Sequence, residues 1–236
     1  MKTVLLKFSG PLQSWGTDSH FETRHTDSHP SKSGVVGMIA AGQGYRRDDD
    51  EKIRRLNDLG FAVRVDQPGQ IMREYHTVAK YKDNGDFDRT YVTNRYYLQD
   101  AVFVVALSSD DDELIHDVET AVTNPYFSIS LGRRSLPPTA DFYIGTVDSD
   151  AMTALSKLPW QASEWYQKRS TDNLQIFADA ALSHNGTRRI RNDIVVSFSQ
   201  SRGRKFEPRQ ETLLMQSVTA LDKNEDHDIF NAIGGG

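Results

Sequence analysis

Cysteine is absent from this chain of 236 residues. Its absence excludes disulfide bonds, thiolate nucleophiles and cysteine-ligated zinc or iron–sulfur sites. Long apolar runs are missing too, because the run that begins at Val4 is interrupted by Lys7. A secretion signal needs an apolar core of about 7–15 residues, and a membrane helix needs about 20. We therefore expect a cytoplasmic protein that does not enter a membrane.

The chain also has no surplus of basic over acidic residues. The chain has 28 Lys and Arg residues against 33 Asp and Glu residues, which gives a net charge of −5. This balance excludes a protein that is basic over its whole surface, but it permits a local basic face. A hydrophobic share of 37% and a charged share of 26% are typical of a globular chain with a core of its own.

Motifs for nucleotides and metals are also lacking. The sequence has no GxxxxGK[ST] phosphate loop, and the GxxG match Gly34-Val-Val-Gly37 lies in an apolar stretch, where packing explains it better than RNA contact. His20, His25 and His29 lie close together, but their spacing is that of a loop and no HExxH motif accompanies them. The sequence therefore predicts neither a metal site nor a cofactor.

What the sequence does contain is the pattern of an α+β fold. Apolar runs predict strands at 2–8, 61–65, 101–107 and 141–147. Helical spacing predicts helices, the first capped by Ser33, at 34–44, 46–60 and 110–122. Without residues 70–98, the order is strand, helix, strand, strand, helix, strand. This is the ferredoxin-like order, which RNA-binding RRM domains share. Beyond residue 150, a short helix at 150–158 and extended runs at 174–181, 193–199 and 211–219 predict a small, mostly β appendage, followed by an acidic, frayed tail.

Three basic clusters stand out in this acidic chain. The first lies in two extended runs at 70–98, joined at an Asn-Gly turn, where basic residues alternate with tyrosines. Such alternation is typical of strands that bind RNA backbone and stack unpaired bases. The second is Arg133-Arg134 after Gly132, a pair suited to bidentate phosphate contact, and the third runs from 188 to 209. Together they indicate a confined basic face.

Five blocks of sequence follow one another along the chain: GPLQSWG at 10–16, PSKSGVVGMIAAGQG at 30–44, REYHTV at 73–78, YYLQDAVFVVAL at 96–107 and LGRRSLPP at 131–138. In sequence and in order these blocks resemble the CasD family, the RAMP subunits of type I-E CRISPR Cascade complexes. The similarity covers residues 1–148, and beyond 150 it is reduced to a weak match at 207–210.

The resemblance implies both a fold and a role. The implied fold is α+β, with a ferredoxin-like (RRM-like, RAMP) domain at 1–148, a β-hairpin thumb inserted at about 73–98, and a small β-rich C-terminal domain at 149–236. The implied role is to hold the 5′ handle of CRISPR RNA, to cap the assembly, and to contact its backbone and large subunits. Target DNA is expected to be met only through the assembled complex.

The resemblance also implies which residues contact the handle. They are Gln13, Ser14, Trp15, Lys32, Ser33, Arg73, His76, Arg95, Arg133 and Arg134. Trp15 fits equally well as a core anchor. Lys32 precedes a helix N-terminus, where anions bind, but local sequence alone favours a plain Ser cap with an exposed Lys. Lys32 also stands where relatives are expected to carry Arg, so phosphate contact is retained and bidentate geometry is lost.

Catalysis is not expected in the favoured interpretation. A sibling subfamily in type I-C systems cleaves precursor RNA with Tyr, Lys and His, and His76, Lys80 and Tyr81 supply these residue types here. The alternative is therefore a metal-independent endoribonuclease. A third interpretation is a protein-only scaffold whose basic faces meet acidic partners. Only the two RNA-binding interpretations predict nucleic acid that copurifies with the protein.

Overall fold

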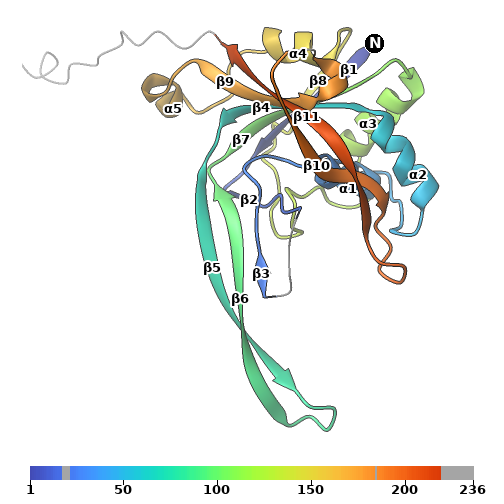
Figure 1. Cartoon of the computed structure of the whole chain (residues 1–236), viewed down its shortest axis with the longest axis vertical. Coiled ribbons are helices and arrows are strands. Elements are labelled where there is room, and N and C mark those ends of the chain that lie inside the picture. Colours follow the sequence, from blue (N-terminus) through green and yellow to red (C-terminus); the bar gives the residue numbers. More distant parts are fainter. Residues whose placement is uncertain (18–21, 184, 219–236) are drawn as a thin grey trace, which may run out of the picture.

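The computed structural model of the chain describes residues 1–17, 22–183 and 185–218, and it consists of a body and a long projecting hairpin (Figure 1). The body is built on one seven-stranded sheet in which every neighbouring pair is antiparallel. Its spatial order is β10-β11-β9-β4-β7-β1-β8. The strands are β1 (Lys2–Ser9), β4 (Gly60–Gln67), β7 (Val102–Ser109), β8 (Tyr143–Val147), β9 (Asn173–Asp179), β10 (Thr187–Ser197) and β11 (Lys205–Ser217).

The centre of the sheet is buried on both faces. Val4, Leu6 and Phe8 of β1 belong to the main core, whereas Leu5 between them belongs to the core of the opposite face. This follows from the alternation of side chains along a strand, and it explains why β1 is almost continuously apolar. The main face is covered by α1 (Lys32–Gly42), α2 (Asp50–Arg55), the short helix η1 (Leu56–Asp58) and α3 (Asp112–Thr123).

The opposite face is covered by α4 (Ala151–Lys157), whose position is fixed by a buried arginine on β4. Arg64 forms two bonds with Asp66, at 2.7 and 2.8 Å, and donates to three backbone carbonyls at the end of α4, those of Leu155, Leu158 and Pro159. All five N–H donors of the guanidinium are therefore used.

Among the described residues, no helix is long and apolar enough to span a bilayer.

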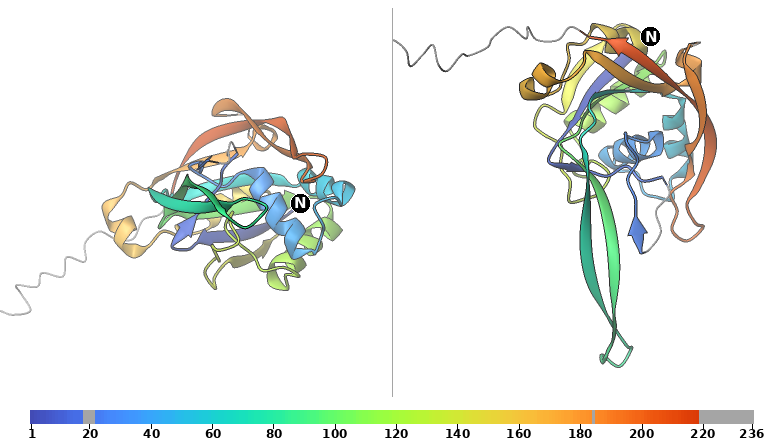
Figure 2. Two further views of the ribbon diagram at one scale, coloured as in Figure 1. Left: turned by 90° about the horizontal axis from the view of Figure 1, so that it is seen from below. Right: turned by 60° about the vertical axis from the view of Figure 1, so that its left-hand side comes forward.

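A second, smaller sheet carries the hairpin. It consists of β2 (Leu12–Gln13), β3 (Thr23–Arg24), β5 (Gln70–Tyr81) and β6 (Phe87–Gln99), with β6 in contact with the other three. Gly85 in the hairpin turn has a φ of +87°, a conformation that favours glycine, as the Asn-Gly dipeptide predicts. Two views agree that β3 lies between the hairpin and the β10–β11 turn (Figures 1 and 2).

Most elements predicted from the sequence are present, with shifted ends. Ser31, not Ser33, caps α1, because the Ser31 hydroxyl accepts a bond from the Gly34 amide at 3.2 Å. The expected helix at 46–60 is also wrong in length, since its N-terminal part is not helical. The helix α5 (Glu164–Arg169) and the short helix η2 (Ala180–Leu182) were not predicted, because each is a single turn or little more.

The strands beyond residue 149 join the main sheet. β9 pairs with β4 over four residue pairs, from Ala62 with Ala178 to Val65 with Gln175. β11 then pairs with β9, and β10 with β11. The C-terminal strands therefore continue the sheet of the N-terminal part, and the division into two domains near residue 149 stays a prediction. The acidic tail lies outside the described residues.

A buried charge network attaches these strands to α1. The Lys32 amide donates to Asp193 at 2.9 Å, and its ammonium donates to Asp179 at 3.0 Å. Arg209 bonds Asp193 through two nitrogens, at 2.8 and 2.9 Å, and also bonds Asp179 and Glu211, each at 2.9 Å. We call these five residues the Asp193 network. It joins one helix to three strands.

Replacing Glu211 by Gln tests this network. We expect a loss of about 3–5 kcal/mol of unfolding free energy at neutral pH, because buried guanidiniums lose their carboxylate. Burial opposes the charge on Glu211, but the His29 ring and the guanidiniums of Arg191 and Arg209 outweigh it and lower the pKa from 4.5 to about 2. As pH falls, the unfolded chain takes up this proton first, so the stabilisation is complete above 4.5 and is lost toward pH 2.

The measurement is urea unfolding of wild type and Glu211→Gln at a series of pH values. The difference between the two proteins should shrink as the pH falls below 4.5. Glu207→Gln, an exposed carboxyl on the same strand, is the matched control and should change stability little. A difference that is independent of pH would contradict the assigned charge on Glu211.

Candidate nucleic-acid interface

A cavity of about 670 Å³ opens where the second sheet meets the body. Four separate segments contribute to its wall: the loop after β2, the end of β3 with His25, strand β6, and the loop between α3 and β8. The β10–β11 turn adds one more side chain. The lining residues are Ser14, Gly16, Arg24, His25, Arg95, Gly132, Arg133, Arg134, Ser135 and Arg204. We call this the cationic cavity.

The cationic cavity concentrates positive charge in an acidic chain. Five arginines line it, and no Asp or Glu is among the described residues of its wall. Two guanidinium nitrogens there, Arg95 Nε and Arg133 Nη1, are buried and have no hydrogen-bond partner within the described part of the chain. A buried donor without an acceptor costs about 1–3 kcal/mol. The arrangement therefore suits an anionic, multidentate ligand that supplies acceptors.

Arg133 is held firmly at the centre of this wall. Its guanidinium lies 4.3 Å from the centre of the Tyr97 ring, and its Nη2 donates to the carbonyls of Arg24 and Tyr96, both at 3.2 Å. Burial lowers its pKa from the ordinary value for arginine, but a guanidinium remains charged at neutral pH. These contacts fix the plane of the guanidinium without using Nη1.

The glycine before Arg133 allows two loops to lie in contact. Gly132 has a φ of +93°, and a Cβ at this position would overlap the carbonyl oxygen of Ser14. The Ser14 amide donates to the carbonyl of Leu131 at 3.1 Å. Ser14 and Arg133 therefore enter the same cavity because a residue without a side chain separates them.

A second hollow, of about 700 Å³, adjoins the cationic cavity and shares Ser14, Gly16, Gly132 and Arg204 with it. Its chemistry is different, because its wall combines aromatic rings with further arginines. The aromatic residues are Trp15, Tyr45, Phe127, Phe198 and Phe206, and the additional cations are Arg46 and Arg47. Aromatic faces beside guanidiniums form surfaces on which planar groups stack.

One face of the hairpin extends the charged surface outward from Arg95. Opposed residues of an antiparallel pair share a face. The register therefore places on this face Glu74 with Arg95, His76 with Thr93, Val78 with Tyr91, and Lys80 with Arg89. The Tyr97 hydroxyl donates to Glu74 at 2.7 Å and, together with His76 at 2.7 Å, lowers the pKa of that carboxyl. The face is polar and of mixed charge.

The structure brings together four of the ten residues that the sequence assigned to RNA. Ser14, Arg95, Arg133 and Arg134 line the cationic cavity. Ser33 lines the adjoining hollow instead. Arg73 and His76 lie on the hairpin outside both cavities, and Arg73 donates to Asn94 at 2.9 Å. RNA contact by these seven residues stays a prediction.

The other three residues are buried, and RNA contact by them also stays a prediction. The Gln13 side chain is fully buried and bonds the carbonyls of Phe8 and Ala101 and the Trp15 indole. Trp15 is only 2% exposed and stacks on Phe8, which fits the role of core anchor. Lys32 is 4% exposed and its ammonium bonds within the Asp193 network, so the exposed Lys that local sequence favoured is wrong.

Three basic residues of the cavity were missed: Arg24, His25 and Arg204. Arg204 belongs to the basic run at 188–209, but nothing local distinguishes it from its neighbours. Arg24 ends β3, and His25 follows it in a segment whose histidines suggested only a possible metal site. His25 stacks on Tyr96, with ring centres 5.3 Å apart, which is why it faces this cavity.

The two described histidines of that segment, His25 and His29, do not converge. His29 is buried against Phe177, with ring centres 3.8 Å apart, whereas His25 is on the cavity wall. His20 lies outside the described residues. Among the residues that the structure describes, no three His, Asp or Glu side chains form a group that could hold a metal ion.

Comparisons with known proteins identify the family. Residues 3–210 match the family model described as "CRISPR-associated protein (Cas_Cas5)", so the chain belongs to the Cas5 family of CRISPR-associated proteins. The CRISPR system Cascade subunit CasD of Escherichia coli (strain K12) is 33% identical over an alignment of 182 residues, and the match covers 71% of this chain and 81% of that protein. The resemblance found in the sequence is thus confirmed.

Two solved structures have the same α+β architecture. A chain of a "CRISPR RNA-guided surveillance complex" superimposes with a TM-score of 0.77 at 30% identity, over 92% of this chain and 90% of that one. A structure described as "Crystal structure of Cas protein" gives a TM-score of 0.69, also at 30% identity, over 93% and 98% of the two chains. The whole fold, including the C-terminal strands, therefore has counterparts.

Gly132→Ala tests the contact between the two cavity loops. We expect a loss of about 3–5 kcal/mol of unfolding free energy, because backbone strain adds to overlap with Ser14. Gly85→Ala is the matched control: its φ of +87° is similar, but a Cβ there meets nothing within 4 Å. Strain alone should cost it about 1–2 kcal/mol. Equal losses in urea unfolding would contradict close packing at Gly132.

Proposed function

We propose that this chain is a subunit of a type I-E Cascade complex in the cytoplasm, where it holds the 5′ handle of CRISPR RNA without cutting it. The observation that carries the proposal is the cationic cavity, with five arginines and no lining carboxylate within the described residues. Backbone phosphates are ligands that planar guanidinium donors bind in pairs. The match to CasD supplies the type of assembly in which such an RNA occurs.

The adjoining hollow supports a single-stranded segment rather than a duplex. Single-stranded RNA is bound by a positive groove along its backbone and by aromatic rings on which unpaired bases stack. Both surfaces lie side by side here, because Arg204 and Gly132 belong to both cavities. We infer that phosphates of the handle occupy the cationic cavity and that bases enter the hollow beside Phe127 and Phe206.

We also infer a ferredoxin-like domain with a thumb. The support is the spatial order β4-β7-β1-β8, with α1 and α3 packed on one face, together with the chain order expected for that fold. The β5–β6 hairpin is inserted between β4 and β7 and is proposed as the thumb that contacts RNA beyond the handle. Backbone and large subunits are its proposed protein partners, and target DNA is met only through them.

The spacing on the hairpin argues against a nuclease site of His76, Lys80 and Tyr81. At about 3.3 Å of rise per residue, His76 and Tyr81 are separated by about 16 Å along one strand. Tyr81 packs edge-on against Phe87, at 6.2 Å between ring centres, and His76 bonds Glu74. Acid–base cleavage requires both groups within reach of one phosphodiester. We therefore retain the binding role.

The test is binding of labelled repeat-derived RNA to the purified chain in a metal chelator, on native and denaturing gels. We expect a shifted band with intact RNA. Arg133→Ala/Arg134→Ala should weaken binding at least about tenfold, because each lost charge-assisted bond contributes about 1.5–3 kcal/mol. The slope of log Kd against log salt should fall by about 0.7 for each lost phosphate contact.

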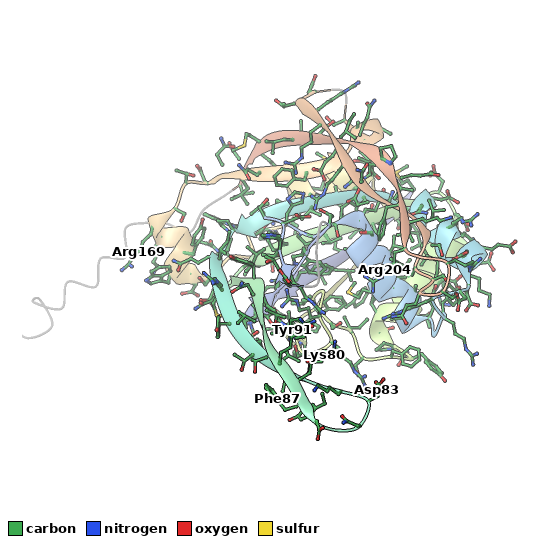
Figure 3. All side chains as sticks on the ribbon, turned by 60° about the horizontal axis from the view of Figure 1, so that its bottom comes forward. Lys80, Asp83, Phe87, Tyr91, Arg169 and Arg204 are labelled. Carbon is green, nitrogen blue, oxygen red and sulfur yellow. The ribbon has the colours of Figure 1, made fainter. Side chains whose placement is uncertain are left out.

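Lys168→Ala/Arg169→Ala is the matched control, because it removes the same charge from α5, far from Arg204 (Figure 3). It should leave the affinity near that of wild type. Equal weakening by both double variants would show nonspecific attraction and overturn the assignment of the cavity. A discrete RNA product that is lost in His76→Ala would overturn the proposal that the chain does not cut.

A further inference from the structure

Strand β10 contacts the loop that follows β3, close in sequence to the wall of the cationic cavity. Arg191 Nη2 donates to Asp27 Oδ2 at 2.6 Å, and the Arg191 side chain is only 10% exposed. Asp27 follows Arg24 and His25 closely in sequence, and both of these line the cavity. We call this ion pair the Arg191–Asp27 clasp. It lies outside the cavity wall itself.

Asp27 also contacts the other loop of the cavity. Thr17 Oγ1 donates to Asp27 Oδ2 at 2.9 Å, and the Asp27 amide donates to the carbonyl of Trp15 at 3.3 Å. The Trp15 amide in turn donates to Thr26 Oγ1 at 2.9 Å. The two segments that bring Ser14 and Arg24 to the cavity are therefore joined at the residue that Arg191 holds.

His29 provides a second anchor for the same loop. Its ring stacks on Phe177, and its Nε2 faces Arg191 Nη1 and Arg189 Nη2, the latter at 3.2 Å. The same Nε2 lies 3.4 Å from Glu211 Oε1, and Nδ1 lies 3.2 Å from Ser28 Oγ. Burial lowers the pKa of His29. Arg191 thus holds the loop at two points.

We infer that Arg191 is a positioning residue for the cavity. Through its ion pair with Asp27, Arg191 fixes the segment that includes Arg24 and His25. Arg191 itself is not part of the cavity wall. The inference rests on the proposed RNA-binding function. Without the clasp, the loop would have to be ordered when RNA binds, and ordering side chains on binding costs affinity.

Asp27→Asn separates this role from simple electrostatics. The change removes a negative charge near a cationic cavity, so electrostatics alone would tighten RNA binding. Loss of the clasp predicts the opposite, and we expect affinity about tenfold weaker. Asp172→Asn, an exposed carboxyl beside α5, is the charge-matched control and should not weaken binding. Affinity that is unchanged or tighter in Asp27→Asn would overturn the inference.

Arg191→Gln and its control Arg188→Gln, an exposed position on the same strand, provide the complementary pair. Both remove one positive charge, but only Arg191→Gln should weaken binding strongly. Amide hydrogen exchange of the RNA-free proteins is measured as well, because Arg191 also contacts the Asp193 network and its loss affects stability. Faster exchange confined to residues 14–17 and 22–28 supports the clasp, whereas faster exchange throughout the sheet overturns a local role.

The two proposals fail in different ways. Wild-type protein that does not bind the handle overturns the proposed function, and the exchange measurement then still tests whether Arg191 fixes the loop. Wild-type binding that Asp27→Asn does not weaken overturns the inference and leaves the function intact. A double-mutant cycle of Asp27→Asn and Arg191→Gln should show non-additive losses in affinity, because both changes remove one contact. Additive losses would contradict the clasp.

Discussion

The buried carboxylate of Asp193 is the point on which the arrangement of this protein depends. It accepts the first amide of α1 from Lys32 and two bonds from Arg209, so one side chain on β10 joins a helix to the neighbouring strand β11. An isolated carboxylate would not remain charged in such a place, and the surrounding cations are therefore as necessary as the carboxylate. Because β11 pairs with β9 and β9 with β4, the same contact connects the C-terminal strands to the body from two sides.

Two groups of arginines in this chain differ in whether carboxylates of the protein neutralise their charge. Arg189, Arg191 and Arg209 bond carboxylates inside the protein, chiefly Glu211, Asp27 and Asp193. The arginines of the cationic cavity face a wall without a carboxylate in the described part of the chain. A net charge of −5 is therefore compatible with a strongly positive site. The basic run at 188–209 contains both groups, since Arg204 lines the cavity while Arg191 and Arg209 are internal.

How much could be predicted from the sequence depended on whether the signal was local. The central strands and the hairpin followed from apolar runs and from Asn84-Gly85, because these signals are local. Arg133 and Arg134 followed from paired cations at a glycine turn. The burial of Gln13, Trp15 and Lys32 could not be predicted in this way. A side chain before a helix or after a short strand has the same local pattern whether it faces solvent or a partner distant in sequence. The carboxylate partner of the Lys32 ammonium, Asp179, is 147 residues away, and no spacing rule connects them.

The unpaired donors of Arg95 and Arg133 complete this argument. A protein interior rarely leaves such groups without partners, and an anion in the cationic cavity would supply the acceptors that these two donors need. The surrounding loops are held by contacts that do not use these nitrogens, namely the stacking of Arg133 on Tyr97 and the bond from Ser14 to Leu131. The loops that carry both donors are therefore held in place by contacts within the protein itself. Acceptors supplied by an anion would remove the cost of the unpaired donors, and an anion that binds only the folded chain would raise its unfolding free energy.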